Sequence, residues 1–170
     1  MPLPPPLRVL GVDPGLHATG WAVIAEGEDG VAVQWGVIHP TRNTPVARRL
    51  GEIVDALDAT ISAQRPHVVA VERPFVKENV RAAMALGQAQ AAAFIAAARH
   101  DLDVAEYAPR EVKRIVSGDG GAEKEAMAES LRLEFGLLQA PEPLDAADAL
   151  AVAYCHLLSQ RLDALIASQA

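Results

Sequence analysis

The sequence is poor in cysteine and has no long apolar run. Its 170 residues include one cysteine, Cys155, which excludes an internal disulfide and a zinc site built from cysteines. A single thiol fits the reducing cytoplasm, where we expect the protein to act. No apolar run approaches the ~20 residues that a membrane-spanning helix needs, so we expect no membrane association. Residues 1–6 are mostly proline and lack the charged and apolar regions of a signal peptide, so we interpret them as a disordered lead.

Positive charge is also scarce, because the net charge is −7. A balance of this sign argues at first against a protein that binds nucleic acid. The basic residues are unevenly placed, however, and gather after Glu72 and before the last pair of acidic residues. These two groups are Arg73, Lys77 and Arg81, and Arg110, Lys113, Arg114 and Lys124. The sequence also lacks a Gly-Lys-Ser/Thr phosphate-binding motif and any Ser-His-Asp or Cys-His arrangement, which are the usual signatures of nucleotide binding and nucleophilic catalysis.

The apolar pattern predicts one α/β domain over residues 1–170. Predicted strands span residues 7–13, 21–26, 31–39, 67–72 and 104–107. Predicted helices span residues 45–64, 79–100, 109–116, 122–138 and 143–164. The first three strands are joined by short turns and indicate an antiparallel meander, whereas the all-apolar fourth strand is typical of a parallel strand covered on both faces. This order predicts a mixed five-stranded sheet with helices on both faces.

The predicted helix at 79–100 has small or apolar residues on nearly every face. A helix that is apolar all round is expected to be buried all round. In a chain of this length, a second copy of the protein is a candidate for the second covering surface.

Four carboxylates carry the functional prediction: Asp13, Glu72, Asp145 and Asp148. Asp13 and Glu72 each end an apolar strand, and the last two lie three residues apart at the start of a helix, on one face. Like charges that are gathered and buried need something positive between them. Oxygen ligands suit Mg²⁺ or Mn²⁺ rather than zinc, and a pair of such ions is the usual machinery of phosphodiester hydrolysis.

Each acidic residue also has a simpler interpretation. Asp13 lies in an Asp-Pro-Gly turn, Glu72 is a solvated acid at a strand end, and Asp145 and Asp148 stabilise a helix dipole. Asp-x-Gly after a first strand also describes the phosphate-binding hairpin of actin-like ATPases, but 170 residues leave no room for the second lobe that such a protein needs. A non-catalytic scaffold, with the acids too far apart to hold metal, remains open at this point.

Other side chains are candidates for contact with nucleic acid. Phe75 lies in a loop beside Lys77 and is a candidate for stacking on a base, although plugging the core is the commoner fate of such a residue. Lys113 and Lys124 flank a glycine-rich loop and are candidates for neutralising a phosphodiester. His17 follows Asp13 and is a weaker candidate for the site.

The chain resembles the bacterial RuvC-type Holliday-junction resolvases. The resemblance covers about residues 8 to 158, and its motifs occur in the family's order and spacing. They are Gly11-Val12-Asp13-Pro14-Gly15, Val71-Glu72 with Phe75 and Asn79, Ala85-Leu86-Gly87-Gln88-Ala89, Glu106-Tyr107-Ala108-Pro109-Arg110-Glu111-Val112-Lys113, Glu123-Lys124, and Asp145-Ala146-Ala147-Asp148-Ala149-Leu150-Ala151.

The resemblance implies an RNase H-like fold and a homodimeric nuclease that nicks two symmetric strands of a four-way DNA junction in recombination and repair. It implies that Asp13, Glu72, Asp145 and Asp148 are the catalytic, metal-binding acids. It implies contacts with the junction for Lys113 and Lys124, stacking at the junction centre for Phe75, and the RuvAB branch-migration complex as a partner. We add Lys77, Arg81 and Arg110 as expected DNA-binding residues from their positions.

Nicks with 5′-phosphate and 3′-hydroxyl ends are expected from hydrolysis with two Mg²⁺ or Mn²⁺ ions. A relative that acts on RNA or on another branched substrate would share the acids, and the residues alone do not separate the two.

Overall fold

The computed structural model describes residues 6–27, 30–73 and 79–169. Its centre is one five-stranded sheet, in the order β3-β2-β1-β4-β5. The strands are β1 (Arg8–Asp13), β2 (Thr19–Gly27), β3 (Gly30–Ile38), β4 (Val68–Glu72) and β5 (Asp103–Tyr107). β1, β2 and β3 form the predicted antiparallel meander, and β4 and β5 run parallel to β1. The mixed five-stranded sheet predicted from the sequence is therefore confirmed.

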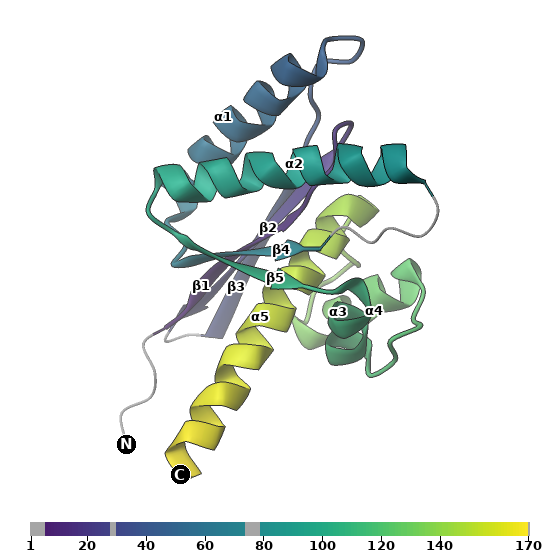
Figure 1. The fold of residues 1–170 in the computed structure, drawn as a ribbon. Helices are drawn as coiled ribbons and strands as arrows, with labels where there is room; N and C mark the ends of the chain where they lie inside the picture. Colours follow the sequence, from purple (N-terminus) through teal and green to yellow (C-terminus); the bar gives the residue numbers. More distant parts are fainter. Residues whose placement is uncertain (1–5, 28–29, 74–78, 170) are drawn as a thin grey trace.

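Helices cover both faces of this sheet (Figure 1). They are α1 (Val46–Gln64), α2 (Val80–Arg99), α3 (Pro109–Ser117), α4 (Lys124–Glu134) and α5 (Leu144–Gln169). α1 and α2 pack on one face, over a core that includes Leu10, Ile53 and Leu57. α3, α4 and α5 pack on the other, over a core that includes Leu131 and Leu150. In the parts of the chain that the structure describes, no helix is both long enough and apolar enough to traverse a bilayer.

β1 is the middle strand, and its neighbours on either side run in opposite directions. Four of its six residues are buried, as expected of a strand covered on both faces. Because β1, β4 and β5 are parallel, their carboxyl ends lie at one edge of the sheet. That edge carries Asp13, Glu72 and Tyr107 as the last residues of the three strands.

Three elements differ from the predicted bounds by two residues or more at one end or both. β2 begins at Thr19 rather than residue 21, because the Thr19 hydroxyl donates to the carbonyl oxygen of Gly15 at 2.8 Å and closes a shorter turn. α4 spans Lys124–Glu134 rather than 122–138, because the chain adopts a left-handed conformation at Gly136 (φ 61°), a common way to end a helix. α5 continues to Gln169 rather than ending at 164, through residues such as Ala164 and Leu165 that favour helix.

Within one chain α2 is buried on one side only, so the described residues do not supply the predicted second covering surface. The alanines Ala92, Ala93, Ala96 and Ala97 are buried against the rest of the protein. On the opposite side Val80, Met84 and Ile95 are exposed by 67%, 64% and 48%. The apolar pattern of a helix predicts that its faces are covered, but it does not show whether the covering surface belongs to the same chain or to another one.

Candidate active site

Two strand ends place Asp13 and Glu72 side by side. Val12 of β1 pairs with Val71 of β4, and the next residue of each strand is the acid. Both side chains are partly buried. The parallel register therefore brings together two carboxylates that lie 59 positions apart in the sequence.

α5 brings a second pair of acids to the same edge. It packs so closely on β1 and β2 that two glycines are required beneath it. A Cβ atom on Gly20 would overlap the carbonyl oxygen of Asp145, and one on Gly11 would overlap that of Ala149. This close approach places the first turns of α5, with Asp145 and Asp148, over the end of β1.

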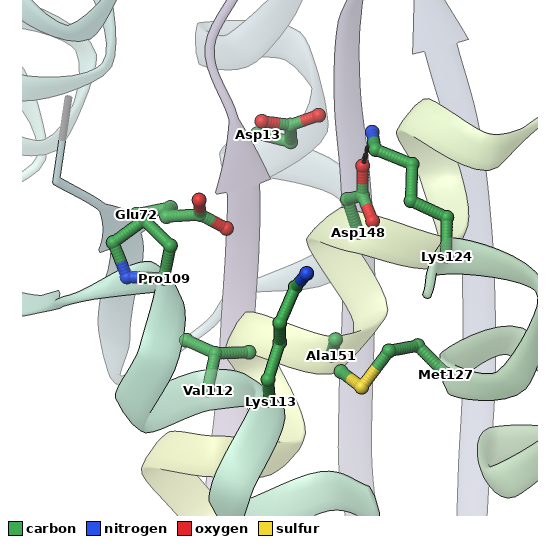
Figure 2. Close-up of a pocket in the computed structure, with 9 residues that line it drawn as sticks. All are labelled: Asp13, Glu72, Pro109, Val112, Lys113, Lys124, Met127, Asp148 and Ala151. Atoms are coloured by element: carbon green, nitrogen blue, oxygen red, sulfur yellow. Dashed lines mark hydrogen bonds and ion pairs between the residues drawn. The ribbon is translucent and has the colours of Figure 1, made fainter. Parts of the chain in front are cut away.

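A small pocket of about 130 Å³ opens where these elements meet. Figure 2 shows the carboxylates of Asp13, Glu72 and Asp148 around one space, with the ammonium of Lys113 pointing into it. The pocket is lined by Asp13, Glu72, Pro109, Val112, Lys113, Lys124, Met127, Asp148 and Ala151. Five elements of the fold, β1, β4, α3, α4 and α5, contribute these residues.

The crowding of negative charge raises two pKa values. Burial and the charges of Asp148 and Glu72 raise the pKa of Asp13 from 3.8 to about 8. Burial and the charge of Asp148 raise the pKa of Glu72 from 4.5 to about 7. These carboxylates hold protons near neutral pH unless a positive charge is brought among them.

Two lysines supply part of that positive charge. Lys124, the first residue of α4, forms an ion pair with Asp148, and the side chains of the two are 53% and 19% exposed. Burial opposes the charge on Lys124, but its hydrogen bond to Asp148 and the negative charges of Asp148, Asp13 and Asp145 together outweigh this effect and raise the pKa of the ammonium. Lys113 of α3 lowers the pKa of Glu72 through its charge. Both lysines therefore act as counter-ions to the acids.

The donor set of this pocket fits a hard divalent cation. Its acidic side chains offer oxygen atoms alone, and the raised pKa values of Asp13 and Glu72 mark a place where a cation is favoured. As the side chains stand, no three acidic, histidine or cysteine residues within 6–27, 30–73 and 79–169 are close enough to share one ion. The positive charge beside Asp148 is instead the ammonium of Lys124.

The remaining predicted site residues lie outside the pocket lining or outside the residues that the structure describes. Asp145 does not line the pocket, although its charge contributes to the raised pKa of Asp13. Arg81 at the start of α2 and Arg110 in α3 are exposed and lie outside the pocket lining. His17 is exposed and also lies outside it. Phe75 and Lys77 lie outside the residues that the structure describes.

Sequence reasoning did not single out the apolar part of the pocket. Pro109, Val112, Met127 and Ala151 line it beside the charged residues. Ala151 follows Asp148 by three positions, so the helix spacing offered a signal for it. Val112 and Met127 carry no such signal, because an apolar residue in an amphipathic helix is expected to face the core in any case.

Several known proteins similar to this chain are RuvC proteins. A protein-family model for the crossover junction endodeoxyribonuclease RuvC matches residues 9–156. The chain is 44% identical to the RuvC of Dehalococcoides mccartyi over 164 residues, which is 96% of this chain and 99% of the relative. It is 45% identical to the RuvC of Chlorobaculum parvum over 150 residues, which is 88% of this chain and 80% of the relative.

Solved structures agree with these matches. The structure of Thermus thermophilus RuvC in complex with a Holliday junction substrate superposes with a TM-score of 0.85 at 33% identity, over 92% of this chain and 96% of that one. The yeast mitochondrial Holliday junction resolvase superposes with a TM-score of 0.64 at 15% identity, over 91% of this chain and 79% of that one, which shows a shared fold alone.

Proposed function

This chain belongs to the RuvC family of crossover junction endodeoxyribonucleases, and from its RNase H-like fold and its acidic pocket we propose how it acts on a DNA junction. The family identity makes it an endodeoxyribonuclease of recombination and repair. We infer that it makes two symmetric nicks in a four-way junction, and that Asp13, Glu72, Asp145 and Asp148 form the metal-binding acidic centre.

One observation carries the assignment of the site. Asp13, Glu72 and Asp148 come from β1, β4 and α5 and line one pocket together with Lys113 and Lys124. Burial and mutual repulsion raise the pKa values of two of these acids to about 8 and about 7. Acidic residues that serve only to keep a surface in contact with water would not be gathered in one partly buried pocket. The arrangement supports a site that is completed by a cation.

We propose Mg²⁺ or Mn²⁺ as that cation, with two ions in each active site. Such ions, when bound, activate water and stabilise the leaving oxygen of a phosphodiester. Asp13 lies between Glu72 and Asp148 at the end of the middle strand, so it would hold a cation together with either of them. A cation beside Asp148 would compete with Lys124 for that carboxylate, and the ammonium of Lys124 would then be available to a DNA phosphate. Lys113 points into the pocket and serves the scissile phosphate in the same way.

Four further residues are proposed to contact DNA. Arg81 and Arg110 are exposed, as contact with a phosphate requires. Lys77 and Phe75 are proposed from their positions in the sequence, with Phe75 stacking on a base at the junction centre. Contacts to phosphates make binding depend steeply on salt.

We propose that α2 forms the interface of a homodimer. Val80, Met84 and Ile95 are exposed on the side of α2 that faces away from the core, with Ala91 between them on the same face. A two-fold dimer suits a junction in which two equivalent strands are cut. Ile95→Glu is expected to give a monomer in sedimentation velocity and to lose paired nicks, whereas Leu165→Glu at the exposed end of α5 is expected to leave both unchanged.

The central test uses a mobile synthetic four-way DNA junction, labelled on each strand in turn, with Mg²⁺, Mn²⁺ or EDTA. Paired, symmetric nicks that DNA ligase seals, absent with EDTA and absent in Asp13→Asn, are the expected result. Asp13→Asn should still bind the junction. Cutting by Asp13→Asn would overturn the assignment of the site, and preference for duplex or RNA over the junction would overturn the assigned substrate.

We propose that the protein acts in the cytoplasm, where bacterial DNA lies. We also propose that it works with the RuvAB branch-migration complex. Measuring whether RuvAB raises the rate of junction cleavage by this protein tests the second.

A further inference from the structure

A buried polar pair joins α5 to β5 beside the active site. The hydroxyl of Tyr107 and Nδ1 of His156 lie 2.7 Å apart, within hydrogen-bonding distance. The two rings meet edge to face at 5.9 Å, and the residues are only 9% and 5% exposed. Among the side chain–side chain hydrogen bonds of the described residues, this is the one that is buried. Buried polar pairs are uncommon enough in an apolar core to need a reason.

The Tyr107 end of this pair is attached to Glu72. Tyr107 is the last residue of β5 and pairs in register with Glu72 at the end of β4. Its carbonyl oxygen accepts a hydrogen bond of 2.8 Å from the backbone N–H of Arg73. Two residues later Pro109 begins α3, which carries Lys113 into the pocket. Moving Tyr107 therefore moves the backbone that holds Glu72 and Lys113.

The His156 end is attached to the other acids. His156 lies in α5, about two turns after Asp148 and about three turns after Asp145. A helix moves along its axis as a nearly rigid body. The position of His156 relative to Tyr107 therefore sets the position of Asp145 and Asp148, which lie in the same helix. The hydrogen bond therefore links β5, which pairs with the strand that carries Glu72, to α5, which carries Asp145 and Asp148.

The rest of the contact between α5 and the sheet is apolar. α5 lies on Gly11 and Gly20, and buries small residues such as Ala149 together with larger ones such as Leu150 and Leu157. Apolar burial is non-directional, whereas a hydrogen bond adds a preferred length and angle between two named groups. Burial lowers the pKa of His156 and raises that of Tyr107, so the pair adds no charge to the core.

We propose that Tyr107 and His156 are positioning residues that fix α5 along β5, so that Asp148 and Asp145 stand at the correct distance from Glu72 and Asp13 to hold metal. This role rests on the proposed metal-binding function of the four acids. Neither residue lines the pocket, so their effect is on the geometry of the acids and not on substrate.

The test is Mn²⁺ binding to the DNA-free protein, measured by titration calorimetry, for Tyr107→Phe and His156→Leu. Each variant is expected to bind Mn²⁺ roughly 10-fold more weakly, at the low end of what the loss of an outer-shell partner produces. Junction binding in EDTA is expected to stay within twofold of wild type. His156→Asn is expected to restore Mn²⁺ binding, because its Oδ1 can take the place of Nδ1 as acceptor for the Tyr107 hydroxyl.

Tyr154→Phe is the matched control. Tyr154 is also a buried tyrosine of this core, but its hydroxyl faces Glu134 in α4, away from the acids. It is expected to lower thermal stability without changing Mn²⁺ affinity. Equal losses of Mn²⁺ affinity in Tyr154→Phe and Tyr107→Phe, or none in Tyr107→Phe, would overturn the positioning role.

The same titration separates this inference from the proposed function. If wild type binds Mn²⁺ and Asp13→Asn does not, the metal site stands whatever the Tyr107 variants do. If wild type binds no Mn²⁺ and cuts no junction, the proposed function itself fails and the positioning role fails with it.

Discussion

Replacing Asp13 with Asn is expected to stabilise the metal-free protein at alkaline pH while abolishing cleavage. In the folded protein, burial and the neighbouring acids raise the pKa of Asp13 to about 8, against 3.8 in the absence of these effects. The unfolded chain therefore loses this proton first as pH rises. The sign follows from linkage: the folded state binds more protons between these two values, so stability falls as pH rises through that window.

The size of the effect follows from the shift. At ~1.4 kcal/mol for each pKa unit, raising the pH from 5 to 8 lowers the free energy of unfolding by at most ~4 kcal/mol, because Asp13 is ionised in the unfolded chain and still protonated in the folded one. Relaxation of the pocket and access of water reduce this, so we expect ~2–4 kcal/mol. Asn has the shape of Asp without its charge, and Asp13→Asn should lose this part of the pH dependence. Glu72, whose pKa is raised to about 7, should leave a residual slope of the same sign.

The assay is urea unfolding in EDTA at several pH values from 5 to 8.5. Asp163→Asn, in the exposed end of α5, is the control and should follow wild type. Adding Mg²⁺ at pH 8 should stabilise wild type by ~2.7 kcal/mol when its concentration is 100 times the dissociation constant, and should have little effect on Asp13→Asn. Parallel pH dependences for wild type and Asp13→Asn would refute the reasoning, because they would mean that Asp13 is not held protonated by its surroundings.

Three further predictions test the packing and charge around the site. Gly20→Ala should destabilise the protein by ~1–3 kcal/mol in urea unfolding and reduce cleavage, because the added Cβ pushes against the carbonyl oxygen of Asp145 and moves the start of α5. Lys124→Met should shift the acid limb of the pH–rate profile of cleavage to higher pH, because removing the ammonium raises the pKa values of Asp13 and Glu72 further. Leu150→Ala should lower the free energy of unfolding by ~2–5 kcal/mol, because Leu150 of α5 is fully buried in the core on that face of the sheet and the substitution leaves a cavity.

The sheet could be predicted because its signals are local. Three strands separated by short turns can only form a meander, and the structure confirms it in β1, β2 and β3. The all-apolar pattern of β4 predicted a strand covered on both faces, and four of its five residues are buried. Element ends were less accurate, since the left-handed residue Gly136 that ends α4 gives no apolar signal.

The residues of the candidate site could also be selected from the sequence. Asp13 and Glu72 were identifiable because each directly follows a buried strand, and Asp145 and Asp148 because they share a helix face. Motifs in the right order then pointed to a family, which the matched family model confirms over residues 9–156. The roles of the individual residues remain predictions.

What only the tertiary structure decided is how these groups act on one another. The sequence determined which residue types lie at strand ends and helix starts, because periodicity and turn chemistry are properties of neighbours along the chain. The pKa of Asp13, the pairing of Lys124 with Asp148 and the bond between Tyr107 and His156 depend on residues 24 to 135 positions apart. Electrostatic fields and buried hydrogen bonds depend on distance in space and on the exclusion of water. The field at Asp13 and the buried hydrogen bond therefore arise only once α5 has packed against β1, β2 and β5.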